Sequence, residues 1–316
     1  MAAATIVLGL DAGGTRTVCQ LADMSGQILS ETRGPGANLQ AAGELEVEKV
    51  LHQVIDDALG DRAEPPAAIC LGMAGVDRPR DAEIVQGILT RIGQRARVLV
   101  VNDALIALEA GVPGAPGIVL IAGTGSIAYG RDGRHRAARA GGWGYVLGDE
   151  GSGYWLGRQA LRAVVRAADG RGPATALTPR VLAHFGVAEA PLLVREIYHG
   201  SARPGAIAAL AREVQAAAID GDALATHIID VGASELAAAV VSVATRLQMH
   251  DGPIVLSGGT LLGVTRLREG VVAALGRTLP DADVRPLATS PATGAVRLAI
   301  AVAQGRAAVP AYVETW

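Results

Sequence analysis

The stretch Ile6–Leu29, IVLGLDAGGTRTVCQLADMSGQIL, contains the pattern that decides the fold. The apolar run Ile6–Leu10 is typical of a buried strand, and the glycine-rich turn DAGGTRT follows it. The residues Thr17–Asp23 are again typical of a strand, and DMSGQ indicates a hairpin turn into a third strand. This order of strand, glycine turn, strand and hairpin is the first unit of the predicted architecture.

The same order of features recurs in IVLIAGTGSIAYGRDGRHRAARA, which begins at Ile118. A short apolar strand leads into a Gly/Thr/Ser turn, a second strand and a turn at RDG. Strands that alternate with helices predict α/β layers, so we expect two duplicated α/β lobes that face each other across a cleft. The linker candidate is GVPGAPG, Gly111–Gly117. The further elements expected are helices over 44–59, 81–92 and 292–304, and strands over 67–75, 97–103 and 252–259.

Charge and cysteine content exclude several classes of function. The formal charge of −3 gives no large positive field to hold nucleic acid. The basic run Arg131–Arg139 has no aromatic partners for stacking bases, and we expect a solvated hairpin tip there. Cys19 and Cys70 are the only two cysteines, so neither a disulfide framework nor a Cys-x-x-Cys metal pair can form.

Membrane attachment is not expected from the pattern. The N-terminal segment has no basic leader, and Asp11 interrupts its apolar run. The longest apolar candidate, Ile228–Leu247, contains Asp230, Glu235 and Arg246, and it predicts an amphipathic helix rather than a spanning one. We therefore expect a cytoplasmic protein in a reducing compartment.

The two glycine turns match neither of the common nucleotide signatures. No Gly-x-x-x-x-Gly-Lys-Ser/Thr segment is present, and each turn leads into a strand rather than a helix. Glycine still lets an anion approach backbone N–H groups in such a turn, and a tight β-turn without a ligand is the alternative. Asp11 would repel phosphate unless Mg²⁺ stood between them. Hydroxyl donors at the turns are Thr15, Thr124 and Ser126.

A single carboxylate, Asp103, interrupts the apolar stretch VLVVNDALIAL, Val98–Leu108. It follows a predicted strand, and ligands of open α/β sheets lie outside the carboxyl ends of strands. A catalytic role is one interpretation. The other is that Asp103 caps the next helix, where Asp is favoured, and the two are compatible.

The motifs in their order resemble a known family. GLDAGGTRT, NDA, AGTGS, GGWGYVLGDEGSGYWLG and LSGG stand in the order found in N-acetylglucosamine kinases, part of the BadF/BadG/BcrA/BcrD ATPase family. Gly141–Gly157 is the most specific piece. The resemblance implies the two-lobed ASKHA fold (ribonuclease H-like, actin/hexokinase), with duplicated α/β domains around a central cleft. The implied lobes are residues 1–114, joined by a return helix at about 292–316, and residues 115–291.

The resemblance also implies roles for individual residues. DAGGTRT looks like the first phosphate loop, and the resemblance implies that Asp11 holds Mg²⁺ through water. GTGS looks like the second phosphate loop, and LSGGT like the segment that receives adenosine. Asp103 matches the catalytic base, which would accept the proton of a sugar 6-hydroxyl as that oxygen attacks the γ-phosphate. The residues implied for ATP are Asp11, Gly13, Gly14, Thr15, Arg16, Gly123, Thr124, Gly125, Ser126, Gly258 and Gly259, and those for the sugar are Asn38, Gly75, Asn102, Asp103, Gly142, Trp143 and Asp149.

The implied activity is an ATP-dependent amino-sugar kinase, with N-acetylglucosamine favoured and glucosamine or N-acetylmuramic acid as alternatives. ATP, Mg²⁺ and a small amino sugar are the expected ligands, and the family implies a homodimer. A reductase-activating ATPase of the same family, which shares an iron–sulfur cluster through loop cysteines, is the rival. The six histidines form no His-x-x-x-His pair, which speaks against the zinc-bearing sugar kinases of the ROK family.

The acidic pair Asp149–Glu150 allows a second interpretation. Two carboxylates can serve a glycosidase, but adjacent residues in a loop rarely straddle one bond. Hydrogen bonds from sugar hydroxyls to Asp149 are the better account, and Glu150 would favour the start of the helix expected over YWLGRQALRAVVRAA. Trp143 would either stack on a sugar ring or pack.

Overall fold

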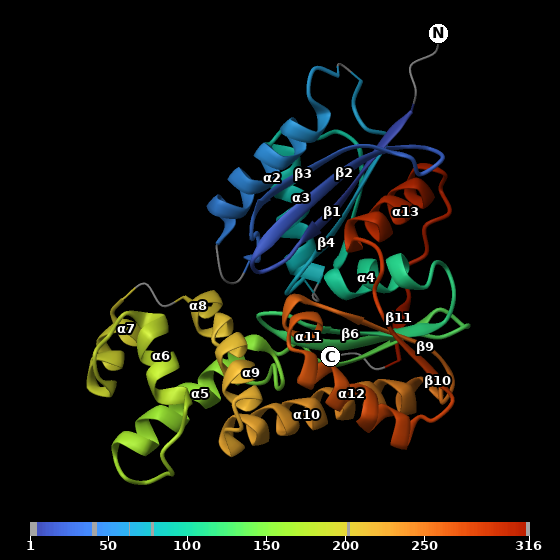
Figure 1. Cartoon of the computed structure of the whole chain (residues 1–316). Coiled ribbons are helices and arrows are strands. Elements are labelled where there is room, and N and C mark those ends of the chain that lie inside the picture. Colours follow the sequence, from blue (N-terminus) through green and yellow to red (C-terminus); the bar gives the residue numbers. More distant parts are fainter. Residues whose placement is uncertain (1–4, 40–42, 63, 77–78, 201–202, 314–316) are drawn as a thin grey trace. The chain divides into compact units, whose positions relative to one another are not determined.

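The computed structural model describes residues 5–39, 43–62, 64–76, 79–200 and 203–313 (Figure 1). The chain divides into two compact units. The first comprises Met1–Val119, Tyr129–Ala138 and Leu287–Trp316, and the second comprises Leu120–Ala128 and Arg139–Pro286. Each unit is therefore built from segments that are distant in the sequence.

The first unit contains a five-stranded sheet with the order β3-β2-β1-β4-β5. β1 pairs antiparallel with β2, and β2 with β3, whereas β1–β4 and β4–β5 are parallel. The glycine turn thus joins two antiparallel neighbours, as the sequence predicts. The strands are β1 (Ile6–Ala12), β2 (Arg16–Asp23), β3 (Ile28–Pro35), β4 (Ala68–Met73) and β5 (Arg97–Asn102).

Helices cover both faces of this sheet (Figure 1). α2 (Glu44–Leu59) packs on β2 and β3, and α3 (Pro79–Arg91) packs on α2 and β5. α4 (Asp103–Gly111) and α13 (Pro291–Ala303) pack on each other and on β1 and β4. β1 and β4 are buried on both faces, which is why they are continuous apolar runs without alternation.

A six-stranded sheet has the order β10-β9-β6-β7-β8-β11, and β6, β7 and β8 contribute residues to both units. The second unit contains β9, β10 and parts of β6, β7 and β8, and its remaining described elements are helices. The strands are β6 (Gly117–Ala122), β7 (Ser126–Arg131), β8 (Arg136–Gly141), β9 (Gly252–Ser257), β10 (Ala282–Pro286) and β11 (Ala311–Tyr312). The helices of the second unit are α5 (Gly153–Ala168), α6 (Leu177–Phe185), η1 (Ala190–Leu192), α7 (Leu193–Tyr198), α8 (Pro204–Ala209), α9 (Ala211–Ile219), α10 (Ala223–Leu247), α11 (Gly259–Gly263) and α12 (Thr265–Thr278).

The expected helix over 228–247 lies within α10, which begins five residues earlier. α10 is long and apolar enough to cross a membrane by length and composition alone. Its apolar side packs against α5, α9 and α12, and a buried core helix passes the same test.

The basic run 131–139 is not wholly a solvated tip, and that expectation needs correction. Gly133 and Arg134 are exposed, but Arg131 and Arg139 are buried. The Arg131 guanidinium lies 2.8 Å from the Glu109 carboxylate, and it donates to the carbonyls of Val112 and Ala115. Glu109 also accepts the Gly114 N–H. This buried pair fixes the connection between α4 and β6, the segment predicted as a linker.

Candidate active site

The first glycine turn, residues 12–15, joins β1 to β2. The Gly13 N–H donates to the Arg16 carbonyl at 3.0 Å, which closes the turn. The Ala37 N–H donates to the Gly13 carbonyl at 3.1 Å. A Cβ atom on Gly36 would collide with the carbonyl of Gly14, so only glycine allows this approach. The segment after β3 therefore supports the turn, and it carries half-buried Asn38 next to the anchoring Ala37.

Asp11 is the penultimate residue of β1, immediately before the first glycine turn. Burial raises the pKa of its carboxyl to about 6, and the Arg16 guanidinium opposes this rise. Burial thus makes the ionised carboxylate of Asp11 unfavourable, and a cation bound beside it would stabilise that ionised form.

The strand register brings Asp11 and Asp103 to the same edge of the first sheet. Ala12 pairs with Met73, and Met73 pairs with Asn102. Asp103 is the next residue, at the start of α4. Two strand spacings separate β1 from β5, or about 10 Å. The carboxyl ends of β1 and β5 thus bring Asp11 and Asp103 to one edge of the sheet, with β4 between their strands.

The cap of α4 is Asn102 and not Asp103, which corrects the alternative interpretation of Asp103. The Asn102 side-chain oxygen accepts the Leu105 N–H at 2.8 Å, and its amide donates to the Tyr312 hydroxyl at 2.9 Å. Asp103 is instead the first helical residue, where the helix end favours negative charge. Sequence reasoning missed Tyr312, because nothing local connects it to a residue 210 positions away.

Gly75 lies in the turn after β4, with a positive φ of 82°. The neighbouring Ala74 N–H donates to the Ala12 carbonyl at 3.1 Å. This hydrogen bond ties the β4 turn to the first glycine turn, so both stand at one edge of the sheet.

The second glycine turn, residues 123–126, joins β6 to β7 in the other unit. The Gly123 carbonyl accepts the Gly153 N–H at 2.8 Å and the Thr260 hydroxyl at 2.9 Å. The Thr124 carbonyl accepts the Tyr154 N–H at 3.3 Å. The first turn of α5 and the start of α11 therefore hold the backbone of this turn.

The aspartate loop, which we define as residues 142–150, follows β8. Burial raises the pKa of Asp149 to about 6, although its carboxylate accepts the backbone N–H groups of Ser126 and Gly144, and Glu150 adds to the rise. Asp149 has a left-handed backbone, with φ 61°, a conformation that Asp tolerates better than most residues. Its carboxylate thus stands at the second glycine turn.

Glu150 lies just before the start of α5 and does not cap it. α5 starts at Gly153, and its cap is Ser152, whose hydroxyl accepts the Trp155 N–H. A serine hydroxyl satisfies one of the unpaired N–H groups at the start of a helix. The cap of α5 is therefore Ser152, and Glu150 lies three residues before the first helical residue. Trp143 is 46% exposed, and the Arg139 guanidinium lies 5.4 Å from its ring centre. Its face is only partly used for packing.

Gly258 and Gly259 stand where β9 ends and α11 begins. Gly258 has a φ of 97°, and a Cβ atom on it would collide with Ala122 at the end of β6. The two glycines therefore lie beside the strand that leads into the second glycine turn.

A model of the BadF/BadG/BcrA/BcrD ATPase family matches residues 8–299 of the chain. The chain belongs to this family. It is 35% identical over 299 residues to an N-acetylmuramic acid/N-acetylglucosamine kinase of Clostridium acetobutylicum, and the match covers 93% of this chain and 97% of that relative. It is 31% identical to an N-acetyl-D-glucosamine kinase of Dictyostelium discoideum, with 93% and 98% covered.

Solved structures agree with the family assignment. A candidate N-acetylglucosamine kinase from Chromobacterium violaceum superposes with a TM-score of 0.78 at 27% identity, over 93% of this chain and 98% of that one. A ROK-family glucokinase from Streptomyces griseus, in complex with glucose and AMPPNP, has a TM-score of 0.58 at 19% identity over 93% and 98%. The second likeness shows the fold alone. This chain therefore has the duplicated α/β fold of the actin/hexokinase type.

Asp11 is the residue of this chain that suits a divalent metal ion at the first glycine turn. Within the described ranges no group of three or more His, Cys, Asp or Glu side chains could hold a metal ion. Mg²⁺ keeps several waters and takes one or two carboxylates together with substrate phosphates. A buried carboxylate beside a glycine turn satisfies that pattern, so Asp11 fits Mg²⁺ bound with nucleotide.

The cysteines do not suit the iron–sulfur branch of the family. Cys19 lies in β2 and Cys70 in β4, and both are fully buried. Burial raises the pKa of the Cys19 thiol to about 12 and that of Cys70 further. Cluster ligands must be thiolates on accessible loops, so neither thiol is placed for that role.

Proposed function

We propose that this protein is an ATP-dependent amino-sugar kinase that transfers the γ-phosphate to the 6-hydroxyl of N-acetylglucosamine. The observation that carries the proposal is the placement of Asp103 and the first glycine turn at one edge of the first sheet. The names of two relatives with more than 30% identity support an amino sugar as the acceptor.

Asp103 is the proposed catalytic base. Phosphoryl transfer needs alignment, neutralisation of phosphate charge and an acceptor for the hydroxyl proton. The Asn102 cap holds the backbone of the first turn of α4, where Asp103 is the first helical residue. The attacking sugar oxygen loses its proton to Asp103 as it bonds to the γ-phosphorus, and ADP leaves with the electron pair of the broken bond.

The glycine turns are the proposed phosphate sites. In the first turn these are Gly13, Gly14 and Thr15, with Arg16 at the start of β2. In the second turn they are Gly123, Thr124 and Gly125, and Ser126 closes the turn behind them. Mg²⁺ held with ATP by Asp11, directly or through water, would neutralise phosphate charge.

The proposed sugar contacts fall in two groups. Asn38, Gly75 and Asn102 form one group, and Gly142, Trp143 and Asp149 of the aspartate loop form the other. Gly258 and Gly259 would receive the adenosine. The Asp149 carboxylate suits sugar hydroxyl groups, because it is an acceptor whose ionised form gains from every added donor.

The acceptor among related sugars is the finer part of the proposal. N-acetylglucosamine is favoured, and N-acetylmuramic acid is named with it for the Clostridium acetobutylicum relative. Glucosamine is the third acceptor, named for a Vibrio cholerae relative with 28% identity over 56% of this chain. A homodimer and a cytoplasmic location stay predictions.

The test is ADP release measured with N-acetylglucosamine, N-acetylmuramic acid, glucosamine and glucose. Sugar-dependent release is expected with the first and not with glucose. The Asp103→Asn variant should lose about 10²–10⁴-fold in turnover and keep its affinity for sugar and ATP. Asp57→Asn, on the exposed side of α2, is the matched control. Near-normal turnover of Asp103→Asn would reject the base, and bound iron in anaerobically purified protein would favour the reductase-activating rival.

A further inference from the structure

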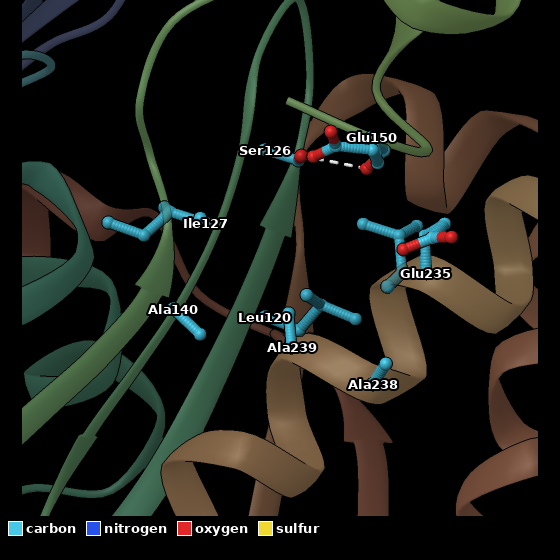
Figure 2. A pocket seen from close by; sticks show the side chains of 10 residues that line it. Leu120, Ser126, Ile127, Ala140, Glu150, Glu235, Ala238 and Ala239 are labelled. Atoms are coloured by element: carbon cyan, nitrogen blue, oxygen red, sulfur yellow. Dashed lines mark hydrogen bonds between the residues drawn. The ribbon is translucent and has the colours of Figure 1, made fainter. Parts of the chain in front are cut away.

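Ser126 is the last residue of the second glycine turn, and every polar group of it is bonded to the aspartate loop. Its carbonyl accepts the Gly142 N–H at 2.9 Å. Its N–H donates to the Asp149 carboxylate, and its hydroxyl donates to the Glu150 carbonyl at 2.9 Å (Figure 2). Ser126 is 8% exposed. The hydroxyl hydrogen expected to serve phosphate is thus directed to the loop.

Asp149 is held from the other side by the same turn. A Cβ atom on Gly125 would lie 2.7 Å from a carboxylate oxygen of Asp149, closer than real atoms approach. Glycine at 125 therefore lets the carboxylate rest against the backbone of the turn. Asp149 is thus in direct contact with Gly125 and hydrogen-bonded to Ser126.

Apolar packing contributes little to the middle of the aspartate loop. Val146 and Leu147 are 74% and 77% exposed. A segment with few buried apolar contacts opens at low free-energy cost. The position of this loop consequently depends on its hydrogen bonds, and those to Ser126 are prominent among them.

The space beside the Ser126–Glu150 hydrogen bond is not filled with side chains. A pocket of about 180 Å³ is bordered by both residues, by Ile127, and by Glu235 and Leu236 of α10 (Figure 2). The Ser126–Glu150 hydrogen bond therefore links the turn to the loop beside a space that side chains leave open.

We propose that Ser126 is a positioning residue that couples the two ligands: sugar bound at Asp149 fixes the aspartate loop, and Ser126 transmits this order to the turn that receives nucleotide phosphate. The inference rests on the proposed function and adds its regulation. Coupling is reciprocal, so nucleotide must tighten sugar binding by the same factor. Without sugar, the second glycine turn is less ordered, which limits wasteful ATP hydrolysis.

The test is calorimetric binding of a non-hydrolysable ATP analogue with Mg²⁺, measured with and without saturating N-acetylglucosamine. In the wild-type protein the sugar should lower the nucleotide Kd by about 5- to 150-fold, the usual range of coupling. Ser126→Ala should bring this ratio close to one while the Kd for sugar alone changes little. Ser126→Thr retains the hydroxyl and should restore the ratio. Ser234→Ala is the control. It removes a hydroxyl on the exposed side of α10 that donates to the Asp230 carbonyl, and it should leave the ratio unchanged.

The outcomes separate the two proposals. One outcome is that the wild-type protein binds both ligands and that Ser126→Ala does not change the ratio of the nucleotide Kd values without and with sugar. That outcome overturns the coupling and does not affect the proposed kinase activity. Equal weakening of nucleotide binding with and without sugar assigns Ser126 to direct phosphate contact and also overturns it. A wild-type protein that binds neither ligand overturns the proposed function and the coupling with it.

Discussion

Replacing Asp11 by Asn should stabilise the ligand-free protein. The pKa of Asp11 rises from 3.8 to about 6 on folding. Each pKa unit corresponds to about 1.4 kcal/mol, so keeping Asp11 ionised costs about 3 kcal/mol of folding free energy. Asn has the same shape and no charge. The free energy of unfolding of Asp11→Asn should therefore exceed that of wild type by up to about 3 kcal/mol at pH 8.

The pH dependence gives this prediction its sign. Below pH 3.8 the carboxyl is protonated in both folded and unfolded chains, and the two proteins should be equally stable. Between pH 3.8 and about 6 the unfolded chain loses the proton and the folded protein keeps it, so wild-type stability falls as pH rises. Above about pH 6 the difference in unfolding free energy between Asp11→Asn and wild type has its full value.

The assay is urea unfolding followed by circular dichroism from pH 2.5 to pH 8, in EDTA and without nucleotide. Asp23→Asn is the opposite-sign control, because hydrogen bonds from Ser25 and Gln27 lower the pKa of Asp23. That variant should lose stability at pH 8, and the loss should shrink as pH falls through the usual range of Asp. An Asp11→Asn variant that is no more stable than wild type at pH 8, or a difference independent of pH, would refute the reasoning.

Three further outcomes follow from buried contacts. Asn102→Ala removes the α4 cap and the bond to the Tyr312 hydroxyl, and thermal unfolding should show a loss of about 1 kcal/mol or more. Glu109→Leu leaves the buried Arg131 guanidinium without its carboxylate and should lower the free energy of unfolding by about 3–5 kcal/mol. A second substitution, Arg131→Met, should restore most of this stability. A double variant as unstable as Glu109→Leu would contradict this account. Cys19 should react with a thiol reagent only after urea is added, because it is buried and its pKa is about 12; rapid labelling of the folded protein would contradict that.

Sequence periodicity predicted the elements well because apolar patterning and glycine turns act locally. The helix over 44–59 has the expected bounds, and the strand over 67–75 shortens to Ala68–Met73. The cap of α4 was assigned to the wrong neighbour. Asn and Asp are both good caps, and the Tyr312 hydroxyl that orients the Asn102 amide comes from the far end of the chain.

The sequence by itself determined the family, the two glycine turns and the acids worth testing, because each of these depends on residue types at short spacing. Only the tertiary structure decided what those side chains contact. The three hydrogen bonds of Ser126, the collision that forbids a side chain on Gly125 and the burial of Arg131 against Glu109 all join atoms far apart in the chain. Hydrogen bonds and desolvation depend on position in space to within a few tenths of an ångström, and chain order alone does not fix that position.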